Sequence, residues 1–439
     1  MNADNRRADN IHRWTLLQKI AFRFFFVFLL LQVLTEGFLG LPFRDSNFVI
    51  WNSIAERFTQ PCLWLNDHFF HYKYIPQVWS TFSGALHTIR DIIYLLTSVL
   101  VCAIWTVLDS KRASYNKVYY WFSRFLITML SASVFFYGII KIFPTQMAAP
   151  SFIDMEKPLG DFSPFWLLWR TFGYGKPFQV FFGILETAGA LFILFRRIRV
   201  TGLFLIAATM INVIIIDYTY SVGNVMITAF YMLLITLFLL APYLKQLFLF
   251  FFTQQPVALS YRGYVPQKRF IDRVVTGIIV VFLTSTFISN THYAYGVYAR
   301  RMNINKTIQY SVIKNQLING DTLQPILNDD LRWRSWFERV RDGQRLVTIT
   351  TMNSVVDKNY RIEEDSVNSA LILYPMNQAD SASLKFNYTK IDDVNWQLEG
   401  TVRQKNMLIE LQRVNPDTVW TLLKIKPQLI IFDDWSDQE

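Results

Sequence analysis

An acidic side chain stands in the middle of an apolar run. Residues 182–192 read FGILETAGALF, and Glu186 is the only charged residue among them. An ionisable group near the centre of a bilayer costs on the order of 2.5–3.5 kcal/mol on the lenient insertion scales. A cation must therefore compensate it. Lys141, with a reach of about 6 Å, stands on the preceding apolar run and is our first choice, and Arg90 is the alternative.

Several other polar residues inside apolar runs fall at a similar depth if successive helices alternate in direction. A rise of about 1.5 Å per residue brings Arg90, Asp91, Lys141 and Asn212 into the same outer half of the membrane as Glu186, and Asp217 follows Asn212 there. Intramembrane charges mark functional sites by default. We therefore predict a pocket for a small amphipathic or anionic ligand, such as a quinone or a lipid head group, with these walls: Arg90, Asp91, Lys141, Glu186 and Asn212. Alternatively, the ion pairs only hold helices together.

Metal and thiol chemistry have few candidate residues. His68 and His71 have the i, i+3 spacing that can hold a metal, but their segment, DHFFHYK, has the aromatic character of a membrane interface. We therefore predict no metal site. Cys62 and Cys102 are the only cysteines, which excludes a disulfide scaffold and a four-thiolate zinc site. The apolar runs between residues 120 and 290 contain no histidine for a haem.

The composition indicates a membrane protein with a soluble C-terminal part. The chain is 52% hydrophobic and 17% charged, against roughly 25% charged in a soluble domain. Residues 1–299 carry 25 Lys and Arg against 14 Asp and Glu, whereas residues 300–439 carry 18 against 19. The basic residues of the first part stand in short loops between apolar runs, as in cytoplasmic loops. The basic pI of 9.4 therefore indicates a lipid bilayer as partner and no nucleic acid.

Seven apolar runs are long enough to cross a membrane, which takes about 20 residues. They lie at about 17–38, 85–108, 120–143, 177–195, 200–217, 223–243 and 272–290. Placing the N-terminus in the cytoplasm puts 15 basic loop residues inside and 6 outside, the imbalance that orients membrane proteins. We expect the first run to be a retained span. The C-terminal domain then lies outside the cytoplasm.

The last part of the chain changes to short runs of β-branched and aromatic residues. From about residue 345 these runs recur at strand-like spacing, which predicts a small antiparallel sandwich or barrel. The stretch RWRSWFERV at 332–340 is compatible with a helix or a strand. The predicted division is a two-span segment at 1–118, a four-helix core at 119–245, a loop and seventh span at 246–299, and a β-rich domain at 300–439.

Motifs in the central runs resemble those of the DoxX-like membrane proteins. The resemblance rests on YGIIKIFPTQMAAPS at 137–151, the stretch from LGDFSPFW to FRR at 159–197, and Thr201-Gly202, with Arg124 ahead of them. It is closest to the longer bacterial members that have extra leading helices and a trailing β domain. The match covers about residues 120–245 closely and most of the chain more distantly.

The resemblance implies a multi-pass protein of the bacterial cytoplasmic membrane with a four-helix core. Some relatives are linked to quinone-coupled oxidation or to membrane thiol-redox complexes, so a quinone is a candidate cofactor, and the cofactor itself stays unknown. The first hypothesis is a quinone- or lipid-binding subunit of a membrane oxidoreductase system. The alternatives are an assembly or anchoring protein whose outer β domain contacts an extracytoplasmic partner, and a carrier for a small solute.

Overall fold

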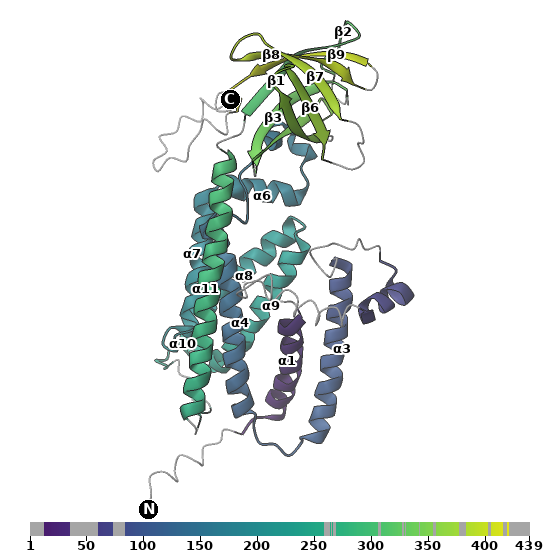
Figure 1. The fold of residues 1–439 in the computed structure, drawn as a ribbon. Helices are drawn as coiled ribbons and strands as arrows, with labels where there is room; N and C mark the ends of the chain where they lie inside the picture. Colours follow the sequence, from purple (N-terminus) through teal and green to yellow (C-terminus); the bar gives the residue numbers. More distant parts are fainter. Residues whose placement is uncertain are drawn as a thin grey trace, which may run out of the picture. The chain divides into compact units, whose positions relative to one another are not determined.

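The chain forms two compact units in the computed structural model (Figure 1). The helical unit consists of residues 1–147 and 175–296, and the barrel unit consists of residues 148–174 and 297–439. The structure describes residues 13–35, 60–72, 84–258, 264, 266, 269–305, 309–326, 329, 331–341, 343–353, 357–376, 383–402, 405–415 and 419–420.

Six helices in the described residues are long and apolar enough to cross a membrane. They are α1 (Leu16–Thr35), α3 (Gly84–Leu108), α4 (Asn116–Ile142), α8 (Arg199–Thr219), α9 (Gly223–Leu240) with its continuation to Thr253, and α11 (Arg269–Asn305). The run predicted as the fourth span is α7 (Lys176–Phe192), which has 17 residues. At about 1.5 Å per residue it is a few ångströms shorter than a typical hydrocarbon core of about 30 Å. Length and composition alone therefore support six of the seven predicted spans.

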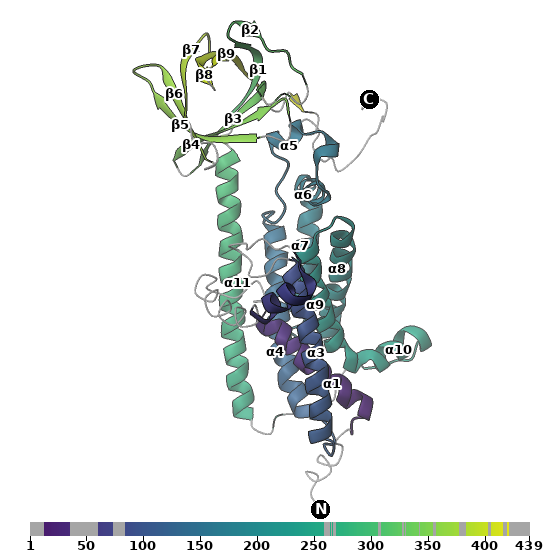
Figure 2. The same cartoon turned by 90° about the vertical axis from the view of Figure 1, so that its right-hand side faces the viewer.

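Four helices form a closed bundle within the predicted core. Helix α4 packs against α7, α7 against α8, α8 against α9, and α9 back against α4 (Figure 2). Helices α1 and α3 pair with each other, and α1 also packs on α9. Helix α11 contacts α4 through aromatic rings, with the centroids of Phe135 and Phe287 4.0 Å apart. The bundle is the scaffold on which the intramembrane polar groups are placed.

Two glycines let α4 and α7 approach each other closely. A Cβ atom on Gly183 of α7 would lie 2.7 Å from the Gly138 carbonyl oxygen and 2.9 Å from the Lys141 Cβ atom of α4. Those separations are too short for a real side chain, so only glycine fits. Small residues at such contacts are characteristic of helix pairs in membranes. This close approach sets the distance between Lys141 and Glu186.

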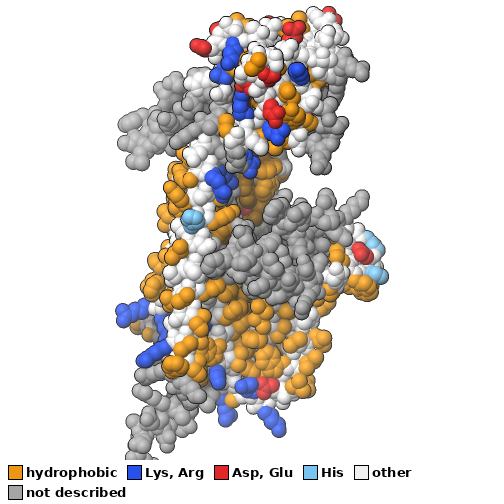
Figure 3. Space-filling model, in the orientation of Figure 1, with side chains coloured by type: hydrophobic (Ala, Val, Ile, Leu, Met, Phe, Trp, Pro, Cys, Tyr) orange, Lys and Arg blue, Asp and Glu red, His pale blue; other side chains and the backbone are white. Residues whose placement is uncertain are grey.

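The outer surface of the helical unit is apolar. Figure 3 shows hydrophobic side chains over much of the helical surface on the face in view, whereas the barrel carries interspersed charges. On α3, Leu96 is 62% exposed and Val107 is 78% exposed. A soluble monomer rarely exposes so wide an apolar surface. Lipid chains are the environment that suits it.

The C-terminal strands form a closed antiparallel barrel. They are β1 (Gln309–Ile318), β2 (Asp321–Thr322), β3 (Trp333–Arg341), β4 (Gln344–Thr351), β5 (Asp357–Asp365), β6 (Ala370–Pro375), β7 (Leu384–Lys390), β8 (Asn395–Val402) and β9 (Lys405–Arg413). Strands β1 and β3 to β9 pair in that order, and β9 pairs back with β1. The short β2 adds a hairpin to the end of β1. Of the two predicted architectures, the barrel is the one observed.

The structure corrects one predicted strand boundary and decides one that the sequence left open. The first strand begins at Gln309 rather than near residue 345, because β1 closes the barrel against β9. The ambiguous stretch at 332–340 is β3. The last predicted strand, at 419–426, lies almost entirely outside the described residues. Large side chains fill the barrel interior, among them Trp333, Trp336 and Phe386, as an eight-stranded barrel allows.

The segment between α4 and α7 belongs to the barrel unit, so it interrupts the predicted core at 119–245. Its short helix α5 (Phe152–Glu156) begins with a capping box formed by Ser151 and Asp154. Helix α6 (Pro164–Tyr174) follows, and Arg170 Nε lies 2.9 Å from Asp154 Oδ2. The ring of Phe152 stacks on that of Phe337 on β3. These contacts attach the segment to the outer face of the barrel.

A buried carboxylate joins this segment to three strands. Glu156 accepts hydrogen bonds from the hydroxyls of Tyr310 at 2.9 Å, Ser335 at 2.8 Å and Thr350 at 2.9 Å. Burial, and next the charge of Glu156, raise the pKa of Tyr310. The Tyr310 hydroxyl therefore keeps its proton and remains a donor. Arg334 Nε lies 4.0 Å away from Glu156 Oε2 and supplies the nearest positive charge among the described residues.

Replacing this carboxylate should destabilise the barrel unit. Glu156→Ala would leave three hydroxyl groups without their acceptor, which we expect to lower the free energy of unfolding by roughly 3 kcal/mol. The measurement is denaturant unfolding of the full chain in detergent, followed by the circular dichroism of the sheet. Glu399→Ala, at an exposed position on β8, is the control. Equal unfolding midpoints for the two variants would contradict this role of Glu156.

Candidate functional site

The charge in the middle of α7 is paired with a lysine. Lys141 Nζ on α4 donates to both carboxylate oxygens of Glu186, at 2.8 and 2.7 Å. Glu186 is 0% exposed and Lys141 is 7% exposed. The pairing favoured by the sequence, with Lys141 ahead of Arg90, is thus confirmed.

Helix geometry explains why these two residues meet. The Cβ atom of Lys141 faces Gly183, and Glu186 lies one helical turn further along α7, on the same face. The lysine chain therefore extends along the groove beside Gly183 to reach the carboxylate. Its ammonium also lies 5.7 Å from the centroid of the Tyr137 ring, one turn back on α4. Such a ring stabilises a nearby cation.

A second carboxylate is buried near the same lysine. Asp217, close to the end of α8, is 5% exposed, and its Oδ2 has no hydrogen-bond partner among the described residues. Lys141 is the charged group that attracts it. Depth along the chain predicted Asp217 for the outer half, but nothing in the sequence singled it out from Asn212. The polar cluster of Lys141, Glu186 and Asp217 therefore contains one ammonium and two carboxylates.

The remaining predicted wall residues lie elsewhere. Asn212 is exposed on the surface of α8 and does not join the cluster. Arg90 Nη2 contacts its neighbour Asp91 at 3.1 Å, and Gln32 of α1 donates to the same oxygen at 3.3 Å. These contacts belong to the pairing of α3 with α1. Similar depth in the membrane did not predict contact between these residues. Depth does not determine which face of a helix a residue occupies or which other helix lies beside that face.

A glutamine stabilises the end of the bundle next to the cluster. Gln179, in the first turns of α7, is 1% exposed. Its amide nitrogen donates to the Met147 carbonyl oxygen at 3.2 Å, and its amide oxygen accepts from the Met147 backbone nitrogen at 3.4 Å. The chain that leaves α4 is therefore attached to the start of α7. This contact was not foreseen, because a glutamine at a helix start carries no distinctive sequence signal.

The histidine and cysteine candidates are not gathered into one cluster within the described residues. His68 stacks on Trp64, with its Nδ1 2.8 Å from the Trp64 carbonyl oxygen, and His71 is an exposed residue with a left-handed backbone. The described residues contain no group of three His, Cys, Asp or Glu side chains placed to hold a metal. Burial raises the pKa of the Cys62 thiol to about 11. That thiol is therefore protonated at neutral pH and is a poor nucleophile.

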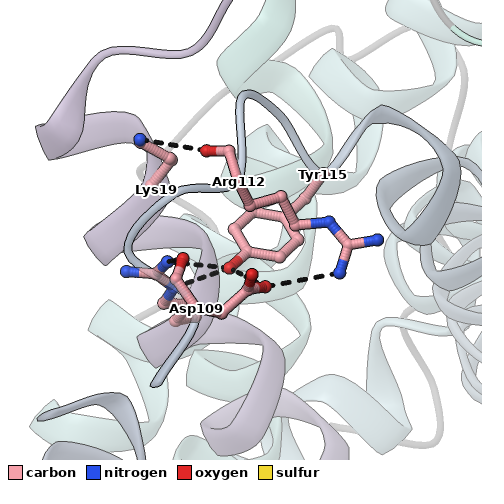
Figure 4. A network of polar contacts seen from close by, with 5 residues as sticks. Lys19, Asp109, Arg112 and Tyr115 are labelled. Atoms are coloured by element: carbon pink, nitrogen blue, oxygen red, sulfur yellow. Dashed lines mark hydrogen bonds and ion pairs between the residues drawn. The ribbon is translucent and has the colours of Figure 1, made fainter. Parts of the chain in front are cut away.

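A separate polar network closes the opposite end of the bundle (Figure 4). Arg23 of α1 is 1% exposed and donates to the Tyr115 hydroxyl, the Thr106 hydroxyl and the Asp109 carbonyl oxygen. The Tyr115 hydroxyl donates to Asp109, and this bond is the main reason that the pKa of Asp109 is lowered. The network joins α1 to the connection between α3 and α4. Its groups are mutually satisfied, as expected of a structural anchor.

Comparisons with known proteins add no identification. No family model matches the chain, and neither the curated proteins nor the solved structures contain a match. The case for a function therefore rests on the geometry of the polar cluster and on the resemblance noted in the sequence.

The ion pair in the bundle can be tested by a double-mutant cycle. Removing one partner of a buried pair typically costs about 3–5 kcal/mol, because the surviving charge is uncompensated. Glu186→Ala should therefore destabilise the protein in detergent more than Glu186→Ala combined with Lys141→Met. The measurement is thermal unfolding of the full chain. A parallel cycle with Arg90→Met serves as control and should be additive, and additive losses in the Lys141 cycle would refute the pairing.

Proposed function

We propose that the chain is a multi-pass membrane protein, DoxX-like in its four-helix core, that binds a small amphipathic ligand at the Lys141, Glu186 and Asp217 cluster. The ligand class is a quinol or a lipid head group. The observation that carries the proposal is the buried Asp217 Oδ2 atom, which has no partner among the described residues. A buried acceptor without a donor costs free energy. A bound donor would remove that cost.

The charges of the cluster indicate which ligands suit it. One ammonium faces two carboxylates, and Glu186 already takes two hydrogen bonds from Lys141. A further anion would lie beside two acidic side chains, which disfavours it. A hydroxyl or ammonium group that donates to Asp217 is favoured instead. This narrows the expected amphipathic or anionic ligand to a hydrogen-bond donor.

The chemistry available to the described residues favours binding over electron transfer by the protein itself. The Cys62 thiol is buried and protonated. Cys102 is also buried, and neither cysteine forms a disulfide. The DoxX-like resemblance associates such cores with quinone-linked systems of the bacterial cytoplasmic membrane. The proposed role is therefore that of a quinol- or lipid-binding subunit.

The membrane topology that fits this proposal has seven spans. Residues 148–174 and 297–439 belong to one compact unit, so both segments must lie on the same side of a membrane. Helices α7, α8, α9 and α11 separate them along the chain. An even number of crossings is required, and α8, α9 and α11 alone would make three. The proposed topology therefore has the 17-residue α7 cross as well. The positive charges of the loops favour the orientation with the barrel outside the cytoplasm.

A second candidate function is favoured by the way the barrel is held. The buried Glu156 joins a loop between two bundle helices to the barrel wall. The barrel thus has an attachment in addition to its covalent link to α11. Such an arrangement suits an anchoring or assembly protein that presents its barrel to an extracytoplasmic partner.

Ligand binding predicts a difference between two leucine substitutions on α8. Quinones and lipids that copurify with the detergent-solubilised protein are quantified by mass spectrometry. Asp217→Leu should reduce the bound ligand at least about tenfold, since a charged hydrogen bond is lost, while the melting temperature is maintained. Asn212→Leu, on the exposed side of the same helix, should leave the ligand content unchanged. Wild-type protein without enriched ligand, or full retention by Asp217→Leu, would leave the anchoring function as the better account.

The seven-span topology can be tested with single cysteines in a Cys62→Ser, Cys102→Ser background. Gly160→Cys lies in open space, Val367 is 92% exposed, and Arg197 is exposed between α7 and α8. A membrane-impermeant thiol reagent applied to intact cells should label Gly160→Cys and Val367→Cys but not Arg197→Cys. Joint labelling of Gly160→Cys and Arg197→Cys would mean that α7 does not cross.

A further inference from the structure

One end of the barrel contains a small hollow. It lies where β1 and β4 begin and where β3 and β9 end, and it is partly open to solvent. The barrel mouth is our name for its polar rim, which consists of Gln309, Glu338, Arg345, Trp396 and Arg413. Below the rim the hollow is lined mainly by buried apolar side chains, which are Trp336, Leu371, Leu398 and Leu411.

The acidic side chains at this end already have a cation. Arg345 donates to Glu338 at 2.7 Å through Nε, and its Nη1 contacts Glu364. Glu364 also accepts a hydrogen bond from the Tyr388 hydroxyl at 2.7 Å. One guanidinium is therefore shared by two carboxylates. Neither carboxylate pairs with any other cation within the described part of the chain.

Arg413, by contrast, is a cation without a carboxylate partner among the described residues. Its Nη2 donates to Gln309 Oε1 at 2.7 Å, and its guanidinium lies 5.5 Å from the centroid of the Trp396 ring. Its Nε is buried and has no hydrogen-bond partner, and no carboxylate of the described residues forms an ion pair with it. Lys390 Nζ lies 4.6 Å from the centroid of the same indole. Two cations thus share one aromatic ring, and Arg413 has no carboxylate partner among the described residues.

Arg413 is the rim cation that has no carboxylate partner among the described residues. A singly charged anion would balance it, whereas a phosphate dianion would be repelled by Glu338 and Glu364 at the same end of the barrel. The apolar floor below the rim suits a ligand with an apolar part. That part must be short, because packed side chains fill the barrel interior.

We propose that the barrel mouth binds a small amphipathic carboxylate. The carboxylate would accept hydrogen bonds from the Arg413 guanidinium, whose fork geometry matches it, and the short apolar chain would lie against Leu371, Leu398 and Leu411. The indole of Trp396 holds Arg413 in place and supplies one wall. This site lies within the barrel unit and is independent of the ligand proposed for the helical unit.

The test is titration of the full chain in detergent with butanoate, followed by saturation-transfer NMR. Butanoate should bind saturably, whereas butan-1-ol, which lacks the charge, and acetate, which lacks the apolar chain, should bind more weakly. Arg413→Gln should weaken butanoate binding about tenfold or more. Arg361→Gln is the matched control, because Arg361 is an exposed arginine of β5 that pairs with Glu363 and stacks on Tyr374. The control should bind as the wild type does.

Several outcomes would overturn the proposal. These are absence of saturable butanoate binding, equal binding of butanoate and butan-1-ol, or equal affinities of the Arg413→Gln and Arg361→Gln variants. If Arg413→Gln alters the circular dichroism of the barrel, Lys390→Gln is the second variant, since Lys390 is exposed. An unchanged affinity in Lys390→Gln would then refute the site. Glu186→Gln should leave butanoate binding unchanged, which separates this test from that of the helical cluster.

Discussion

The helical unit depends on compensating a carboxylate that has no access to solvent. Glu186 is 0% exposed and lies in the interior of an apolar helix. Lys141 supplies the counter-charge, but only because α4 and α7 approach closely enough for its side chain to reach. The contact between Gly138 and Gly183 makes that approach possible, since a single methyl group on either would collide with the other helix. Packing and electrostatics therefore constrain the same helix pair.

The barrel unit contains a second buried carboxylate, whose charge is compensated in a different way. Glu156 is compensated mainly by hydroxyl donors, and a guanidinium lies at a longer distance. Glu156 and Glu186 stand on either side of the start of α7, along one continuous stretch of chain. The segment that carries Glu156 is covalently joined to both helices of the ion pair. Each unit thus depends on a buried acid contributed by the region between residues 148 and 192.

The two units differ in where a ligand can be placed. Large side chains fill the barrel interior, so its chemistry is confined to its ends and its outer wall. The helical unit instead buries polar atoms within its own packing, and one of them, Asp217 Oδ2, lacks a partner in the described residues. An incompletely satisfied polar group is more costly in an apolar surrounding than at a solvated barrel end. That difference is why we propose the primary ligand site in the helical unit.

Much of this organisation can be predicted from the sequence, because the hydrophobic effect acts on local patterns. Apolar runs and basic loops predicted the helices, and the change to strand-like runs predicted the C-terminal β domain. Lys141 was identified as the partner of Glu186, because the cost of an intramembrane charge and the depth of each residue can both be estimated from the sequence.

Tertiary structure decided what depends on neighbours that are distant in the chain. Rotation of α8 exposes Asn212 and buries Asp217, and the pairing of α3 with α1 separates Arg90 and Asp91 from Glu186. Closure of β1 on β9 added strands ahead of residue 345, where the first strand was expected, because a strand is defined by its partner as much as by its own residues. The attachment of residues 148–174 to the barrel was likewise hidden. The sequence around Glu156 does not predict its three hydroxyl donors, because these stand 154 to 194 residues further along the chain.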